Sequence, residues 1–381
     1  MKRVGIVGGG QLARMLAMAG RRLGIRCEVL DPAERPCAAS VARHLRGDFD
    51  DLQALDHLVE DCSVATFDFE NVAVGPLAHL SQRMPVRPPP KALAVAQDRL
   101  EEKRFISELN IPVADFLAID RREDLDAAVD RLGLPCLIKT RRFGYDGKGQ
   151  WKLRERADCD AVWNALQGTP AIAEAWVPFK RELSLIVVRD ARADHRLYPL
   201  TENHHVEGIL CYSLAPAAAD DALRLEAERL AFRLADALDY VGLLAIELFE
   251  MDGHLMVNEI APRVHNSGHW TIEGAHCSQF ENHLRAVTDL PLGDASARGY
   301  TLMLNVVGQW PQREALLACA GVNIHDYEKS AREGRKIGHL TVCADSVEEL
   351  ALRSRALLTA AGRPALWENL QPRIKALQGQ R

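Results

Sequence analysis

The feature that most constrains the fold is the N-terminal stretch VGIVGGGQLARM, residues 4–15, where an apolar strand-like run meets three glycines and a helix-like segment. A helix that begins at such a turn presents its backbone N–H groups and its positive dipole end to an anion. Gly8, Gly10 and Ala13 fit the G-x-G-x-x-G/A dinucleotide fingerprint, and Asp31 ends the next strand-like run, where that motif places an acidic residue. The turn alone leaves three interpretations open: a dinucleotide site, a site for another phosphate, and a tight turn without a ligand.

Strand-like and helix-like runs alternate through about the first 95 residues, and this order predicts a parallel sheet covered by helices. The proline-rich stretch at 84–90 fits neither element and marks a linker. An amphipathic helix is expected over 97–110, followed by a unit with a strand, a glycine loop and a helix up to about residue 175. Strand-rich sequence follows, and the segment from about 295 ends in a helical pattern over 346–362.

Length and composition narrow the class of protein. A chain of 381 residues is too long for one ordinary core, and 48% hydrophobic with 26% charged residues is typical of a soluble globular protein. A net charge of −6 gives no reason to expect nucleic acid binding, and no apolar stretch approaches the roughly 20 residues that span a bilayer. The N-terminus enters a strand without a signal peptide pattern, and nine scattered cysteines form no C-x-x-C pair. A reduced, cytoplasmic compartment is therefore expected.

A second glycine-rich stretch, GYDGKGQ at 144–150, follows the strand-like run that ends near Lys139. Its three glycines allow a flap whose backbone amides approach a polyphosphate, and Lys139 and Lys148 add positive charge. The pattern is not G-x-x-x-x-G-K-[ST], so a P-loop is excluded. A plain turn between two strands is the alternative.

Two strand-like runs over 245–261 flank an Asp-Gly pair and predict a hairpin. A two-residue turn would place Glu247 opposite Asn258 and would put Glu259 on the other face of the hairpin. A three-residue loop over 251–253 would instead put both glutamates on one face as neighbours. The sequence does not decide between the two turns.

Two neighbouring carboxylates inside a protein repel each other unless cations intervene, and oxygen ligands of this kind suit Mg²⁺ that bridges to nucleotide phosphates. A buried salt bridge is the other interpretation of Glu247 and Glu259.

The stretch that directly follows the second strand-like run is dense in polar groups, which favours the rim of a site over a solvated loop. These groups are Arg263, His265, Asn266, Ser267 and His269.

Six motifs in a fixed order give the chain a resemblance to a known family. They are GGGQLARM, DFENV, QDRLEEK, GYDGKGQ, NEIAPRVHNSGHWT and SQFENHLRA. The set resembles that of the 5-(carboxyamino)imidazole ribonucleotide synthases, ATP-grasp ligases of bacterial and fungal purine biosynthesis, and covers nearly the whole chain. The resemblance implies an α/β and α+β protein with the ATP-grasp fold. Its domains would be a Rossmann-like domain over 1–97, a small flap-bearing subdomain over 98–175 and a large subdomain with a C-terminal extension over 176–381.

The resemblance also implies a reaction. ATP and bicarbonate would carboxylate 5-aminoimidazole ribonucleotide to the N5-carboxylated product through carboxyphosphate, with ADP and phosphate released. Glu247 and Glu259 would bind Mg²⁺, with Mn²⁺ as an alternative, residues 174–177 would read adenine mainly through their backbone, and Glu182 would accept from the ribose hydroxyls. The ATP set comprises Arg99, Lys139, Gly144, Tyr145, Asp146, Gly147, Lys148, Gly149, Gln150, Glu174, Ala175, Trp176, Val177, Glu182, His205, Asn258 and Glu259. A homodimer is implied, with neither nucleic acid nor membrane as a partner.

For the second substrate, the resemblance makes the first glycine turn, residues 8–12, a cradle for the 5′-phosphate of the imidazole nucleotide. The substrate set comprises Gly10, Gln11, Leu12, Glu70, Asn71 and Tyr145. The catalytic candidates are Asp146, Arg263, His265 and Lys336. Arg263 and Lys336 would hold bicarbonate, and Asp146 and His265 are candidates for proton transfer.

The chain departs from the family pattern at two positions. Phe143 stands where the family usually has a glycine, and Asp68 replaces a more usual glutamate.

Three other functions compete with the synthase. The first is another ATP-grasp enzyme, such as formate-dependent glycinamide ribonucleotide transformylase or biotin carboxylase. The second is an NAD-dependent oxidoreductase, which rests on the first glycine turn alone, and the third is a non-catalytic nucleotide-binding protein.

Overall fold

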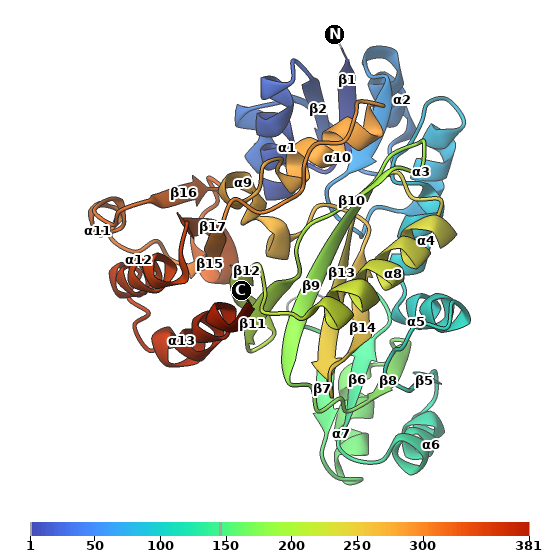
Figure 1. Cartoon of the computed structure of the whole chain (residues 1–381). Helices are drawn as coiled ribbons and strands as arrows, with labels where there is room; N and C mark the ends of the chain where they lie inside the picture. Colours follow the sequence, from blue (N-terminus) through green and yellow to red (C-terminus); the bar gives the residue numbers. More distant parts are fainter. Residues whose placement is uncertain (1, 145–146, 381) are drawn as a thin grey trace.

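The N-terminal sheet is parallel, as the alternating pattern predicts. The computed structural model describes residues 2–144 and 147–380 (Figure 1), so the predicted site residues Tyr145 and Asp146 lie outside the described residues. The sheet has the strand order β3-β2-β1-β4, and each neighbouring pair is parallel. Its elements are β1 (Arg3–Val7), α1 (Gln11–Arg22), β2 (Arg26–Asp31), β3 (Arg43–Arg46), α2 (Leu52–Asp61), β4 (Val64–Phe67), α3 (Val74–Ser81) and α4 (Pro90–Ala96).

A small unit follows, with a four-stranded antiparallel sheet in the order β5-β8-β6-β7. The helix expected over 97–110 is α5, which begins after Asp98, whose carboxylate accepts hydrogen bonds from two backbone N–H groups of the first turn. It ends just before Asn110, which has a left-handed φ of 53°. The elements are α5 (Arg99–Glu108), β5 (Phe116–Ile119), α6 (Arg122–Leu132), β6 (Cys136–Thr140), β7 (Gln150–Leu153), α7 (Asp158–Leu166) and β8 (Ala171–Ala175).

The rest of the chain is built on one nine-stranded sheet in the order β14-β13-β9-β11-β12-β15-β17-β16, with β10 paired to β9. Its strands are β9 (Arg181–Arg189), β10 (His195–Leu197), β11 (Thr201–Val206), β12 (Ile209–Ala215), β13 (Gly242–Met251), β14 (His254–Ala261), β15 (Tyr300–Gly308), β16 (Val322–Asp326) and β17 (Arg332–Ala344). The helices are α8 (Asp221–Ala237), α9 (Thr271–Gly274), α10 (Gln279–Val287), α11 (Arg313–Leu317), α12 (Val347–Ala360) and α13 (Leu366–Ala376). The C-terminal elements thus continue the same sheet through the pairing of β12 with β15.

Contacts distant in sequence tie the N-terminal sheet to the large one. Helix α10 lies beside α1 (Figure 1), and residues of both helices share one buried core with residues of β9 and β13. Buried His283 of α10 links the sheets directly, because its Nε2 lies 2.9 Å from Thr66 Oγ1 and its Nδ1 accepts from the Leu243 N–H at 3.2 Å. Burial lowers the pKa of His283 to about 3, so the ring is neutral. Over residues 2–144 and 147–380, helices of the length and apolarity that a membrane crossing requires are absent.

Candidate active site

A cleft of about 1140 Å³ is lined by residues of the N-terminal sheet unit, the small unit and the large sheet. It brings together most of the residues that the sequence predicts. Those that line it are Gly10, Gln11, Leu12, Glu70, Asn71, Arg99, Lys139, Gly144, Gly147, Lys148, Gln150, Trp176, Glu182, His205, Glu247, Asn258, Glu259, Arg263, His265 and Lys336. Of the predicted residues that the structure describes, four lie outside its lining, namely Gly149, Glu174, Ala175 and Val177.

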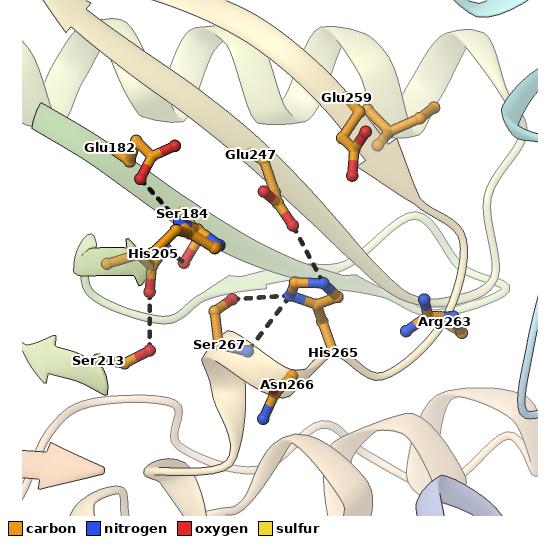
Figure 2. A network of polar contacts seen from close by, with 12 residues as sticks. Glu182, Ser184, His205, Ser213, Glu247, Glu259, Arg263, His265, Asn266 and Ser267 are labelled. Atoms are coloured by element: carbon orange, nitrogen blue, oxygen red, sulfur yellow. Dashed lines mark hydrogen bonds and ion pairs between the residues drawn. The ribbon is translucent and has the colours of Figure 1, made fainter. Parts of the chain in front are cut away.

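Glu247 and Glu259 are direct cross-strand partners on β13 and β14, and both face the same side of the hairpin (Figure 2). The hairpin nevertheless has the two-residue turn, because Met251 pairs with His254. A β-bulge resolves this: Leu248 pairs with Val257, whereas Glu247 pairs with Glu259, so Asn258 is the extra residue. The expectation that a two-residue turn separates the two acids is therefore wrong, since the bulge shifts the register by one residue.

Each of the two acids has its own polar partner. Arg99 Nη1 lies 2.5 Å from Glu259 Oε2, and His265 Nε2 lies 3.1 Å from Glu247 Oε1. Burial alone would raise the pKa of Glu247, but the hydrogen bond from His265 and nearby positive charge hold that pKa at about 2. Burial likewise opposes ionisation of Glu259, and Arg99 keeps its pKa below the ordinary value. Both carboxylates are thus ionised at neutral pH.

The donors around this pair fit a hard divalent cation. Asn258, between the two acids in the register, has a buried Oδ1 without a hydrogen-bond partner among the described residues. Two ionised carboxylates and a free amide oxygen are the kind of oxygen ligands that Mg²⁺ takes in proteins. The neighbouring Glu102 differs, because burial and the charge of Glu259 raise its pKa to about 8.

His265 is oriented by the loop that carries it. Its Nδ1 accepts from the backbone N–H of Ser267 at 3.3 Å and lies 2.9 Å from the Ser267 hydroxyl, so its Nε2 faces Glu247 (Figure 2). Gln279 closes the loop, because its side chain accepts from the His265 N–H at 2.9 Å and donates to the His265 carbonyl at 2.7 Å. The polar stretch after β14 is therefore a structured rim of the cleft, as predicted.

The second glycine stretch and Lys139 form another wall. Lys139 lines the cleft from β6, and its Nζ lies 2.8 Å from Glu174 Oε2. Because the side chain of Glu174 is buried in this ion pair, only its backbone remains for the predicted reading of adenine, and that role stays a prediction.

Phe143, at the base of the loop, has a φ of 62° and is 70% exposed. A left-handed residue favours glycine, which accounts for the glycine that the family usually has there.

Aromatic rings that the sequence did not lead us to expect also line the cleft. Phe179 and Phe249 stack in parallel with their ring centroids 4.5 Å apart, and both line the cleft. A signal existed for Phe249, since it lies two residues after Glu247 on the same strand and therefore shares its face. Nearby, His205 Nδ1 lies 2.7 Å from Glu182 Oε2, and this carboxylate raises the pKa of His205 although burial opposes the shift.

The first glycine turn is held by two aspartates. The N–H of Gly9 donates to Asp31 at 2.8 Å, and the N–H of Gly10 donates to Asp68 at 2.7 Å. Asp31 thus holds the turn itself, which weakens the dinucleotide interpretation. Burial raises the pKa of Asp68 to about 6, and the sequence alone predicts no role for this residue. The N–H groups of residues 11 and 12 lie in the first turn of α1, where no intrahelical acceptor exists, and both residues line the cleft.

Opposite this turn lies the loop between β16 and β17, residues 327–331, with the start of β17. It brings cationic side chains from more than 300 residues away in the chain to the cleft, and the Lys329 ammonium contacts the Gln11 side chain. Of these cations only Lys336 was predicted. Lys329, Arg332 and Arg335 also line the cleft, and the basic run in KSAREGRK was the one available signal. Arg263 of the rim forms an ion pair with Glu70.

Comparisons with known proteins decide the family. Three family models match: a ribonucleotide synthetase preATP-grasp domain over 1–97, an ATP-grasp domain over 104–280 and a phosphoribosylaminoimidazole carboxylase C-terminal domain over 301–353. The N5-carboxyaminoimidazole ribonucleotide synthase of Pseudomonas aeruginosa is 48% identical over 90% of this chain and 95% of its own length. The chain belongs to the N5-carboxyaminoimidazole ribonucleotide synthase family. A relative from Brucella melitensis with the same name is 44% identical over 89% of this chain and 95% of its own.

Solved structures agree with this family. The N5-carboxyaminoimidazole ribonucleotide synthetase of Thermus thermophilus has a TM-score of 0.90 at 46% identity and covers 94% of this chain and 98% of its own. A synthase of Aspergillus clavatus, solved with ADP and 5-aminoimidazole ribonucleotide, has a TM-score of 0.89 at 32% identity and covers 95% and 99% of the two chains. The predicted ATP-grasp fold with an N-terminal parallel-sheet domain is confirmed.

Proposed function

We propose that the cleft is the active site in which this chain carboxylates 5-aminoimidazole ribonucleotide with bicarbonate and ATP. The products are N5-carboxyaminoimidazole ribonucleotide, ADP and phosphate, as the family membership and the ligands of the Aspergillus clavatus relative support. The observation that carries the proposal is the acid pair, because Glu247 and Glu259 face one cleft between the glycine flap and the first glycine turn. In this arrangement the acid pair lies between the proposed site for the nucleoside triphosphate and the proposed site for the 5′-phosphate of the second substrate.

The chemical problem is that bicarbonate is a poor electrophile. ATP overcomes it by transferring its γ-phosphoryl group to bicarbonate, which gives carboxyphosphate and ADP. Such a transfer depends mainly on alignment and on neutralised charge. Glu247, Glu259 and Asn258 would hold Mg²⁺, with Mn²⁺ as an alternative, and the bound cation would offset the charge of the triphosphate. Lys139 and the backbone amides of the described loop residues 144 and 147–150 would contact the same phosphates, and Arg99 supports Glu259.

The second half of the reaction joins the carboxyl group to the exocyclic amine of the imidazole. Arg263 and Lys336 hold the bicarbonate-derived anion near the first glycine turn. The amides of Gln11 and Leu12 and the side chain of Lys329 bind the 5′-phosphate of the nucleotide. Arg335, at the same end of the cleft, adds a second positive charge to that site.

Two groups are proposed to accept the proton that the amine releases. His265 lies within the cleft, with its Nε2 directed at Glu247, and Asp146 follows from the family motif. Closure of the glycine loop would keep water from carboxyphosphate until the amine reacts. We further propose that the protein works in the cytoplasm and forms a homodimer through its N-terminal domain. Analytical ultracentrifugation would test whether the protein is a dimer.

One assay tests the proposed function directly. ADP release is measured with labelled bicarbonate in the presence and absence of 5-aminoimidazole ribonucleotide, and the labelled product is identified by magnetic resonance. We expect ADP and the N5-carboxylated nucleotide to form in equal amounts when all substrates are present. ADP formation that depends on formate, or tight NADH binding without ATP binding, would contradict the proposal and favour the alternatives.

A further inference from the structure

The bulge that aligns the two acids leaves an unusual backbone on the outer edge of β14. β14 lies at the end of the sheet order, so its outer edge pairs with no other strand of this sheet, and it contacts α5 and α8 instead. The N–H of Leu255 donates outward to Glu226 Oε1 at 3.0 Å, and the N–H of Val257 donates outward to the Pro112 carbonyl at 2.8 Å. In a regular strand the next outward N–H would belong to residue 259. The outward N–H is instead that of Ile260, which shows the shift of one residue on this edge too.

Two adjacent residues of α5 contact the shifted backbone. Glu102 Oε1 accepts from the Ile260 N–H at 2.7 Å. The Lys103 ammonium donates to the Asn258 carbonyl at 2.7 Å and lies 3.5 Å from the Val257 carbonyl. Successive carbonyls of a regular strand point to opposite edges, so one ammonium reaches two of them only at a bulge. Both side chains are almost fully buried, 2% exposed for Glu102 and 1% for Lys103.

We propose that Glu102 and Lys103 are positioning residues that lock the β14 bulge and thereby keep Glu259 beside Glu247. The inference rests on the proposed function, because it concerns the same acid pair. Without these partners, a slip of one residue would pair the bulged backbone regularly and turn the side chain of Glu259 to the opposite face. Lys103 also lies 3.8 Å from Glu174, the carboxylate that pairs with Lys139. Helix α5 therefore positions both the acid pair and the lysine that is proposed to contact the phosphates.

The test compares variants on the two sides of the bulge. Glu102→Ala and Lys103→Met remove the partners of the shifted backbone. Glu102→Gln retains a carbonyl acceptor for the Ile260 N–H and serves as the conservative rescue. Glu226→Ala is the matched control, because it removes the acceptor of the Leu255 N–H on the same edge before the bulge.

The first measurement is amide hydrogen exchange of the 257–261 segment in the ligand-free proteins. We expect faster exchange in Glu102→Ala and Lys103→Met, wild-type exchange in Glu102→Gln, and no change in this segment in Glu226→Ala. Unchanged exchange in both test variants, or an equal rise in Glu226→Ala, would overturn the inference. If the truncated variants do not fold, Glu102→Asp, whose carboxylate is one methylene shorter, is expected to give a smaller rise, and wild-type exchange there would overturn it equally.

The second measurement is binding of Mn²⁺ and ADP by calorimetry, with Glu259→Gln alongside. We expect Glu102→Ala and Lys103→Met to weaken metal-dependent ADP binding by about tenfold or more, while ADP binding without metal and the KM for 5-aminoimidazole ribonucleotide stay unchanged. If only Glu259→Gln loses metal-dependent binding, the locking role is wrong and the proposed metal site stands. If Glu259→Gln binds like wild type, the proposed metal site itself is wrong.

Discussion

His265 Nε2 lies 3.1 Å from Glu247 Oε1, and this contact means that the protein supplies its own hydrogen-bond partner to the proposed metal ligand. Arg99 forms an ion pair with Glu259 at 2.5 Å. Like charges side by side in a buried site normally oppose folding, and here each carboxylate has a partner in the protein before any ligand binds. The fold of the site and its loading with a cation are therefore separate events.

Chelation tests this separation. We expect an excess of EDTA to abolish ADP formation and to leave the thermal unfolding midpoint of the ligand-free protein unchanged, because His265 and Arg99 already compensate the acids. Differential scanning calorimetry with and without EDTA measures the midpoint, and restored Mg²⁺ should restore activity. A midpoint lowered by several degrees on chelation would contradict the expectation.

A charge-removing substitution at the acid pair tests the metal assignment. Glu259→Gln is expected to lower ADP formation by at least about a hundredfold, because a neutral amide stabilises a cation bound to the triphosphate far less well. The fold should remain, as circular dichroism would show. Glu226→Gln on α8 is the control and should turn over like wild type. Near-wild-type turnover of Glu259→Gln at ordinary Mg²⁺ would refute the assignment.

The cationic loop at the first glycine turn predicts a split between the two substrates. Lys329→Met and Arg335→Leu are each expected to raise the KM for 5-aminoimidazole ribonucleotide by about tenfold or more, which is typical of a lost charge-assisted hydrogen bond. The KM for ATP should not change, since the proposed ATP site lies at the other end of the cleft. Steady-state kinetics with each substrate varied in turn measures both values. Arg224→Gln, at an exposed position on α8, is the control.

His283 predicts a loss of stability in acid. Its pKa is about 3 in the folded protein and near 6.5 when the chain is unfolded, so the unfolded chain binds the extra proton first. The stability that neutral His283 contributes is complete above pH 6.5 and is lost as the pH falls toward 3, by about 1.4 kcal/mol per pH unit. Urea unfolding at pH 7, 6 and 5 should show a shallower pH dependence for His283→Gln than for wild type, and equal slopes would refute the assignment.

Phe143 predicts opposite effects for two substitutions of a residue that is largely exposed. Its φ of 62° lies in the left-handed region, which asparagine tolerates and which valine, branched at Cβ, strongly disfavours. We expect Phe143→Asn to leave stability unchanged or slightly higher and Phe143→Val to lower it by about 1 kcal/mol. Calorimetric midpoints of the two variants and wild type give the order, and a Val variant as stable as the Asn variant would exclude backbone strain here.

The N-terminal sheet and the hairpin could be predicted because their signals are local. The strand before the first glycine turn and the Asp-Gly pair at 252–253 are short patterns whose structure depends on their own residues. The register of the hairpin could not be predicted in the same way. It depends on the extra residue at Asn258, and that bulge is held by α5, which lies some 150 residues earlier in the chain.

The site was predictable where family motifs supply it and was missed where only tertiary packing does. The motifs led to Lys139, Arg263 and His265, all of which line the cleft. Lys329 reaches the first glycine turn because β16 and β17 belong to the large sheet, which no local pattern indicates. For Glu174 the motif gave the position, but its burial against Lys139 depends on a partner on another strand.

The pairing of β12 with β15 has a consequence for how this protein can be divided. A fragment that stops after α10 would leave β12 with an open edge of unsatisfied backbone groups, a surface that invites association with other chains. Exchange of the C-terminal portion between relatives would likewise succeed only if the incoming strand pairs with β12 in the same way. The C-terminal portion is therefore an integral part of the large sheet and not a separate domain.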